Sequence, residues 1–100
     1  MNFEEAYNEG CPHYIFYNDE IVVKSADIKE LFSVLSKHKK RGTYTFFVAA
    51  KPGEPGLIFN GAELVHTYPD DHVYYEVKTT IAELKEGIAT DARVMLGMLF

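Results

Sequence analysis

The sequence has little cysteine, few basic residues and no long apolar run, and each shortage excludes a class of protein. Cys11 is the only cysteine, so no intramolecular disulfide can form, which fits a reducing compartment. The longest run of apolar residues and glycine, 94–100, is far shorter than the roughly 20 residues of a membrane-spanning helix. The N-terminus lacks the basic and apolar regions of a secretory signal. We therefore expect a complete small cytoplasmic protein with no membrane segment.

Basic residues number ten against fifteen acidic ones, which gives a formal net charge of −5. General nucleic-acid binders and polybasic membrane-surface proteins depend on many lysine and arginine contacts to phosphate. The balance of charge argues against both classes. Eight acidic residues but only four basic ones follow residue 50, so the second half carries most of the negative charge.

The apolar pattern predicts one α+β domain over residues 1–100. We expect an antiparallel sheet of about five or six strands, with one helix between strands and one at the C-terminus. Asn18-Asp19 and Asn60-Gly61 have the composition of hairpin turns. A short helix is predicted over 2–9, and strands over 13–17, 20–24, 44–50, 57–59, 62–68 and 73–79.

Two longer helices are predicted from capping boxes. Asp27 is followed three residues later by Glu30, and Gly42 is expected to end this helix. Thr80 and Glu83 form the second capping box, although 93–100 could instead be a buried strand. The first helix has one apolar stripe, made of Ile28, Leu31, Phe32 and Leu35.

Catalytic motifs are absent from the sequence. Cys11 lies close to His13, but neighbours in sequence do not make a nucleophile–base pair. There is no phosphate-binding glycine loop and no nucleophile elbow. We expect no enzyme and no cofactor. The serines considered as nucleophiles lie on a predicted helix or at its start, without an elbow motif: Ser25, Ser33 and Ser36.

A divalent metal site is a weaker hypothesis. His66, Asp70 and His72 carry ligand types that Zn²⁺ and other divalent ions accept. Pro69-Asp70-Asp71 is also ordinary turn chemistry, and a solvated turn is the favoured interpretation. We therefore predict no metal.

A basic corner precedes the third predicted strand. Basic residues beside strand aromatics, here Tyr44, Phe46 and Phe47, are typical of single-strand nucleic-acid binders. Cations that stabilise a helix C-terminus, followed by core aromatics, account for the same residues, so nucleic acid is not the expected partner. His38 is interpreted as a boundary residue of the helix stripe. The basic corner is Lys37, Lys39, Lys40 and Arg41.

An acidic and aromatic patch is predicted around the turn at 69–71, provided that Tyr74 faces outward. Such a surface suits a partner protein with a basic surface. Cross-strand tyrosine pairing that only stabilises the sheet is the equal alternative. The candidate partner-binding residues are Tyr68, Asp70, Asp71, Tyr74 and Glu76.

Residues 95–100 contain no polar side chain, so this segment is expected to dock in the core or in a second copy of the chain. The candidate homodimer seam is Met95, Met98, Leu99 and Phe100.

These features predict a small acidic binding protein that occupies a partner protein's surface. Size and charge resemble those of inhibitors of nucleic-acid-acting enzymes, of the phage-encoded anti-defence or toxin-immunity type. The alternative is a small-ligand-binding protein or minor enzyme. Its pocket would lie between the sheet and the C-terminal helix and use His66 or His72.

Overall fold

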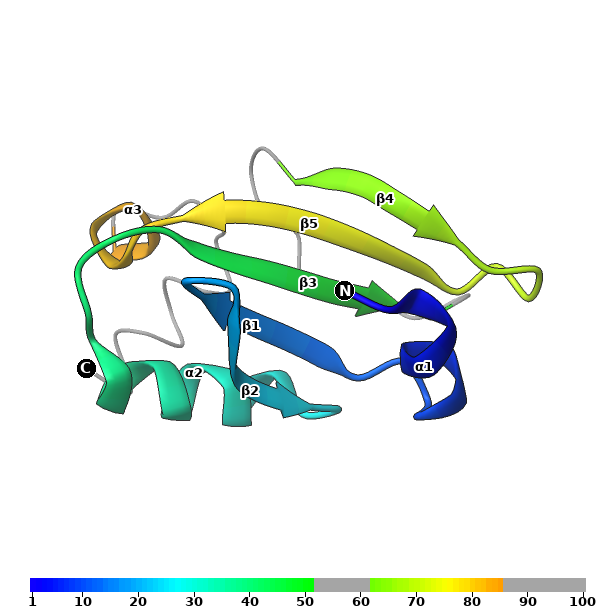
Figure 1. The fold of residues 1–100 in the computed structure, drawn as a ribbon, viewed down its shortest axis with the longest axis horizontal. Helices are drawn as coiled ribbons and strands as arrows, with labels where there is room; N and C mark the ends of the chain where they lie inside the picture. Colours follow the sequence, from blue (N-terminus) through cyan, green and yellow to red (C-terminus); the bar gives the residue numbers. More distant parts are fainter. Residues whose placement is uncertain (52–61, 86–100) are drawn as a thin grey trace.

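The structure, a computed structural model, describes residues 1–51 and 62–85, which form an antiparallel sheet with helices packed on it (Figure 1). The sheet has five strands in the order β2-β1-β3-β5-β4. This confirms the α+β class. The strands are β1 His13–Tyr17, β2 Glu20–Ser25, β3 Tyr44–Ala50, β4 Glu63–Thr67 and β5 Val73–Thr79, and the helices are α1 Phe3–Asn8, α2 Ile28–His38 and α3 Ile81–Lys85. The strand predicted at 57–59, the Asn60-Gly61 turn, and the helix or strand predicted beyond 85 lie outside the described residues.

Side chains of the central strand β3 pack on both faces of the sheet, as the sequence predicts. Phe46 pairs with Ile15 and Val77 on the face that carries α2 and α3. Phe47 pairs with Tyr14 on the opposite face, which α1 partly covers. The domain therefore has two apolar layers, one on each side of the same sheet.

Helix α2 begins where the sequence predicts, but its cap is built differently. The Asp27 side chain accepts a hydrogen bond from Lys29 N at 2.9 Å. Glu30 does not return to the Asp27 amide as in a capping box. Instead, Ser25 Oγ donates to Glu30 at 2.6 Å and accepts from Asp27 N at 3.0 Å. Ser25 thus bridges the Glu30 carboxylate and the Asp27 amide, which would bind each other directly in a capping box.

The same helix ends earlier than predicted. Its last residue is His38, and Lys39 is the C-cap in a left-handed conformation with φ of 37°. The Lys39 amide donates to Leu35 O at 3.1 Å, which satisfies one carbonyl of the last turn. Gly42, the predicted end, lies in the connection to β3 with φ of 120°. The prediction was wrong because a lysine takes the position that glycine usually fills.

The β1–β2 hairpin turns over two residues. Tyr17 pairs with Glu20, and the residues between them, Asn18 and Asp19, have φ of 50° and 62°. A type I′ turn requires positive φ at both central positions, which Asn-Gly satisfies best. Asp19 therefore occupies the position that glycine would fill with least strain.

Asp19→Gly should stabilise the fold by about 0.5 kcal/mol, because relief of left-handed strain outweighs the extra chain entropy of glycine. Asp19→Ala is the matched control and should destabilise it by about 1 kcal/mol, since alanine cannot hydrogen-bond locally in that conformation. Urea unfolding of both variants measures the difference. Equal midpoints for the two variants would contradict the turn assignment.

Candidate functional site

One end of the sheet gathers acidic residues from two separate segments of the chain. Helix α1 lies beside the turn between β4 and β5 at this end (Figure 1). The Tyr7 hydroxyl of α1 donates a hydrogen bond to Asp70 Oδ2 in the turn at 2.8 Å, and the Tyr7 side chain is 41% exposed. We call this surface the acidic end, and all its residues are exposed: Glu4, Glu5, Tyr7, Asp70 and Asp71.

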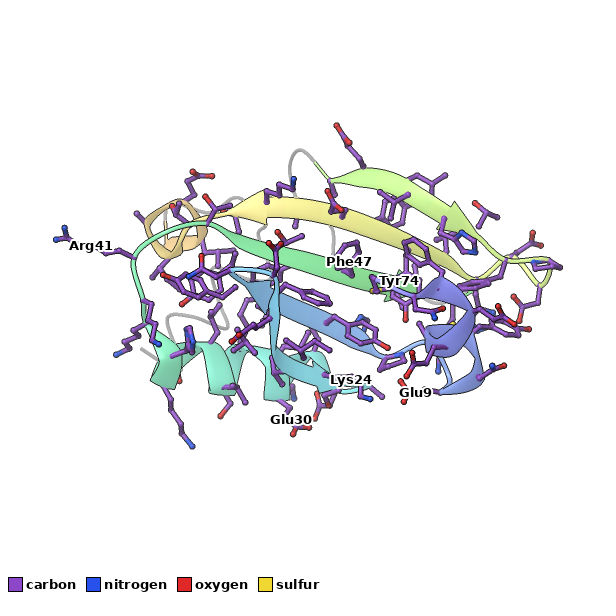
Figure 2. The ribbon with its side chains drawn as sticks, viewed as in Figure 1. Glu9, Lys24, Glu30, Arg41, Phe47 and Tyr74 are labelled. Atoms are coloured by element: carbon purple, nitrogen blue, oxygen red, sulfur yellow. The ribbon has the colours of Figure 1, made fainter. Side chains whose placement is uncertain are left out.

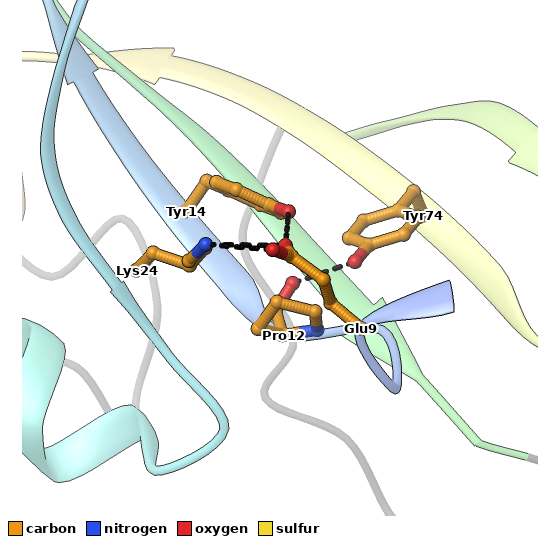
Figure 3. A network of polar contacts seen from close by, with 5 residues as sticks. All are labelled: Glu9, Pro12, Tyr14, Lys24 and Tyr74. Carbon is orange, nitrogen blue, oxygen red and sulfur yellow. Dashed lines mark hydrogen bonds and ion pairs between the residues drawn. The ribbon is translucent and has the colours of Figure 1, made fainter. Parts of the chain in front are cut away.

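The C-terminal side of α1 is tied to the sheet by a polar network (Figure 3). Lys24 Nζ of β2 lies 3.1 Å from both carboxylate oxygens of Glu9. The Tyr14 hydroxyl of β1 donates to Glu9 at 3.3 Å, and burial raises the pKa of Tyr14 to about 12. The Tyr74 hydroxyl of β5 donates to the Pro12 carbonyl at 2.6 Å. Three strands therefore position the helix and the loop that follows it.

The N-terminal side of α1 is held by aromatic contacts. The Phe3 ring is stacked on His66 of β4 with ring centroids 4.6 Å apart. Tyr68, which is buried, donates its hydroxyl to the Phe3 carbonyl, and its ring lies 4.7 Å from that of Tyr7. Because both sides of α1 are fixed, Tyr7 meets Asp70 in a defined geometry.

The turn itself is organised by Asp70. Its Oδ1 accepts from His72 N at 3.2 Å, which is an Asx turn. His72 Nδ1 lies 2.9 Å from Oδ2 without the geometry of a hydrogen bond. The hydrogen bond from Tyr7 holds the pKa of Asp70 below its ordinary value, and it raises the pKa of Tyr7. The carboxylate thus stays charged to a lower pH than an ordinary aspartate.

Tyr7→Phe should raise the pKa of Asp70 toward its ordinary value, because the largest cause of the lowering is removed. A carboxyl group whose pKa is lowered in the folded state stabilises the fold at pH values above its ordinary pKa. This contribution is lost as the pH falls through the lowered pKa. The stability difference between wild type and variant should therefore be present at pH 7 and vanish in acid. NMR titration of the Asp70 carboxyl measures the shift directly. The control Tyr75→Phe, at another exposed tyrosine, should leave that titration unchanged.

The expected outward orientation of Tyr74 is wrong. Its side chain has 0% exposure, because α1 and the following loop cover this half of the face. Burial raises the pKa of Tyr74, so the hydroxyl stays a donor to Pro12. Tyr68 is also buried, beneath Tyr7. Glu76 is half-buried two residues further along β5, opposite Phe47 and Glu63. Neither tyrosine is therefore available to a partner.

Three residues of the acidic end were missed by the sequence analysis. Glu4, Glu5 and Tyr7 belong to a helix that the sequence predicts, but the hydrogen bond that joins Tyr7 to Asp70 spans 63 positions. The one available signal was the exposed face of that helix, which is acidic in its first turn. Only its docking on β4 and β5 brings this face to the turn.

Two of the three candidate metal residues, Asp70 and His72, lie together in the turn, and the third does not join them. His66 packs on Phe3, whereas Asp70 and His72 make the turn contacts. Within residues 1–51 and 62–85, no group of three histidine, cysteine or carboxylate side chains is placed to hold a metal ion.

Cys11 and His13 are not a catalytic pair. The Cys11 thiol is buried, and burial raises its pKa, which keeps it protonated and unreactive. His13 Nδ1 accepts a hydrogen bond from Ala49 N at 3.0 Å, so it serves the backbone of β3. Burial lowers the pKa of His13, which favours the neutral ring that this contact needs.

The lowered pKa of His13 predicts that the free energy of unfolding falls as the pH drops below about 6.5, the ordinary pKa of histidine. The unfolded chain then binds a proton at His13 that the folded chain, with its lowered pKa, resists. His13→Asn keeps an acceptor near Ala49 and should flatten this dependence. The urea unfolding midpoints of wild type and variant are measured at pH 7.5 and pH 5.5. An equal change in midpoint between the two pH values for both proteins would contradict the role of His13.

The basic corner lies at the opposite end of the molecule, where Figure 2 labels Arg41 far from Glu9. Its four residues are exposed. Tyr44 and Phe46 are fully buried, so they offer no platform on which bases could stack. His38 Nδ1 lies 2.6 Å from the Tyr44 hydroxyl, which also accepts from Lys40 N at 3.0 Å. The aromatics serve the core and brace the connection between α2 and β3.

The remaining predicted sites are resolved only in part. The candidate dimer seam, Met95, Met98, Leu99 and Phe100, lies outside the described residues. His66 and His72 lie across the sheet from α3, so the described residues do not bring a histidine pocket to that helix (Figure 1). In the part of the chain that the structure covers, no helix is long and apolar enough to cross a membrane.

Comparisons of this chain with protein-family models, with curated proteins and with solved structures found no match.

Proposed function

We propose that this chain is a small binding protein whose acidic end occupies the basic surface of a partner protein. The observation that carries the proposal is the hydrogen bond from exposed Tyr7 to Asp70, which joins α1, with acidic residues in its first turn, to the acidic β4–β5 turn. Asp70, which accepts from Tyr7 and from His72 N, therefore loses little side-chain freedom on binding. An exposed tyrosine adds contact area at low entropic cost.

The charge distribution supports a steered encounter. The acidic end lies at one end of the sheet and the basic corner at the other, where Asp19 and Glu20 of the β1–β2 hairpin offset part of the positive charge (Figure 1). A molecule with separated charges is oriented by a partner's field before contact, which raises the association rate. Electrostatic orientation would present the acidic end first to a basic surface.

The finer form of the proposal is an inhibitor of a nucleic-acid-acting enzyme. Such an enzyme holds phosphate with lysine and arginine, and clustered carboxylates can pair with the same side chains. A phage-encoded anti-defence protein or a toxin-immunity protein would act in this way. The support for this form is the chemistry of the acidic end together with the small size of the chain.

Capture of partners from a lysate of the source cells tests the proposal when three baits are compared. The first bait is the wild type, the second carries Asp70→Asn and Asp71→Asn, and the third carries Lys37→Ala and Lys40→Ala. A basic protein held by the first and third baits but lost from the second is the expected result. A partner retained by the second bait and lost from the third would place the interaction at the other end and overturn the proposal.

A further inference from the structure

A groove of about 520 Å³ lies between the β1–β2 hairpin and the C-terminal half of α2. Its volume falls within the range of small-molecule sites. It lies at the end of the sheet opposite α1, so it shares no residue with the acidic end (Figure 1). It is lined by Tyr17, Asn18, Glu20, Ile21, Val22, Val34, Lys37, His38 and Lys40.

The two walls of the groove differ in charge. The α2 wall and its C-terminal extension carry both cations, Lys37 and Lys40, and neither forms an ion pair within residues 1–51 and 62–85. The hairpin wall carries one carboxylate, Glu20, and Asp19 lies beside it in the turn. An anionic group would therefore lie toward α2, and a hydrogen-bond donor toward the hairpin.

The groove also has an apolar floor. Val22 and Val34 line it and pack on the core beneath α2. Ile21 lies at its edge, but its side chain shares a face with Phe16 and so points to the opposite side of the sheet. Val22 and Val34 thus offer an apolar surface to a planar group in the groove. The site thus offers cations, a carboxylate and apolar contact within one small volume.

Hydrogen bonds hold the cationic wall in place. Tyr17 of the hairpin donates its hydroxyl to the Arg41 carbonyl, which joins the two sides of the groove. The buried Tyr44 hydroxyl accepts from Lys40 N and lies 2.6 Å from His38 Nδ1. If the hydroxyl donates to Nδ1, the neutral ring carries its proton on Nε2 as a donor for an anion. These contacts fix the backbone at Lys40 and Arg41 and the ring of His38, while the ammonium groups of Lys37 and Lys40 stay exposed.

We propose that this groove binds a small phosphate monoester of the nucleoside monophosphate class. Lys37, Lys40 and His38 would hold the phosphate, whose three free oxygens match three donors. The planar base would lie against Val22 and Val34. Glu20 would accept from an amine or hydroxyl at the far end of the ligand. The proposal rests on these residues alone and is independent of the proposed function.

Titration of the ¹⁵N-labelled protein with adenosine monophosphate tests this site by NMR, with adenosine and inorganic phosphate as separate arms. We expect the amides around 17–22 and 34–40 to shift, with a dissociation constant below about 1 mM. Adenosine and phosphate should each bind at least tenfold more weakly, because each lacks half of the contacts. Lys37→Ala with Lys40→Ala should weaken binding of the monophosphate at least tenfold.

The matched control, Lys29→Ala with Arg41→Ala, removes the same charge from exposed positions that do not line the groove. It should leave the affinity within about twofold of the wild type. An equal loss of affinity for adenosine monophosphate in both double variants would show nonspecific attraction of the anion to positive charge and overturn the proposal. Inorganic phosphate binding as tightly as the monophosphate would overturn the nucleoside class. Absence of shifts around the groove would overturn the site.

Discussion

Tyr74→Ala is expected to destabilise the domain by about 3–5 kcal/mol, the usual loss when a large buried aromatic is truncated. Tyr74 of β5 is fully buried beneath α1 and the loop that follows it. Its ring lies near those of Phe3, Tyr14 and Tyr68. Its removal opens a cavity and leaves the Pro12 carbonyl without its donor. Since a domain of this size has a total stability of about 5–15 kcal/mol, much of the margin would be lost. Urea unfolding measures the change.

Tyr74→Phe separates packing from hydrogen bonding. It keeps the ring and removes only the hydroxyl, so the expected loss is about 1–3 kcal/mol, the cost of an unsatisfied buried carbonyl. Tyr75→Phe is the matched control at the neighbouring exposed position and should change stability by less than about 0.5 kcal/mol. A stability loss for Tyr75→Phe as large as that for Tyr74→Phe would contradict the assignment of the two faces.

Asp70→Asn combined with Asp71→Asn should slow association with the captured partner roughly tenfold at low salt, because electrostatic steering raises on-rates by that order or more. Asparagine keeps an acceptor for His72 N and tolerates the positive φ of 69° at position 71, so the turn is preserved. The oxygen that accepts from Tyr7 becomes an amide nitrogen, which can donate to the tyrosine hydroxyl instead. The expected change is therefore in charge and not in fold. Stopped-flow or surface-plasmon measurements give the rate.

The control for this pair is Asp19→Asn with Glu20→Gln, which changes the net charge equally at the other end of the sheet. Its association rate should stay within about twofold of the wild type. The difference between the two double variants should shrink as salt increases, since exposed charges are screened beyond about 10 Å at 0.1 M salt. An equal rate decrease for both variants would show that net charge matters and that its location does not.

Local signals in the sequence predicted most of the sheet. The aromatic and β-branched residues at 13–17 and 44–50, the alternation at 73–79 and the turn at Asn18-Asp19 match the strands and hairpin closely. These signals act between neighbours, since a strand's alternation and a turn's positive φ are properties of a few adjacent residues. The caps at Asn2, Asp27 and Thr80 were readable for the same reason.

The candidate site was less predictable because it depends on contacts between distant segments. Alternation places Tyr74 and Glu76 on one face, but it does not reveal which part of that face α1 covers. The hydrogen bond between Tyr7 and Asp70 likewise has no local signature. Only the acidic turn at Asp70 and Asp71 was visible in the sequence, as half of the acidic end.

A chemical-shift map of the ¹⁵N-labelled protein bound to its captured partner tests the central claim most directly. If the acidic end is the interface, the largest shifts should fall on amides of α1 and of the β4–β5 turn, with Tyr7 and Asp71 among them. Those shifts should disappear in the variant that carries Asp70→Asn and Asp71→Asn. Shifts confined to the basic corner or to the hairpin groove, with the acidic end unchanged, would contradict the account.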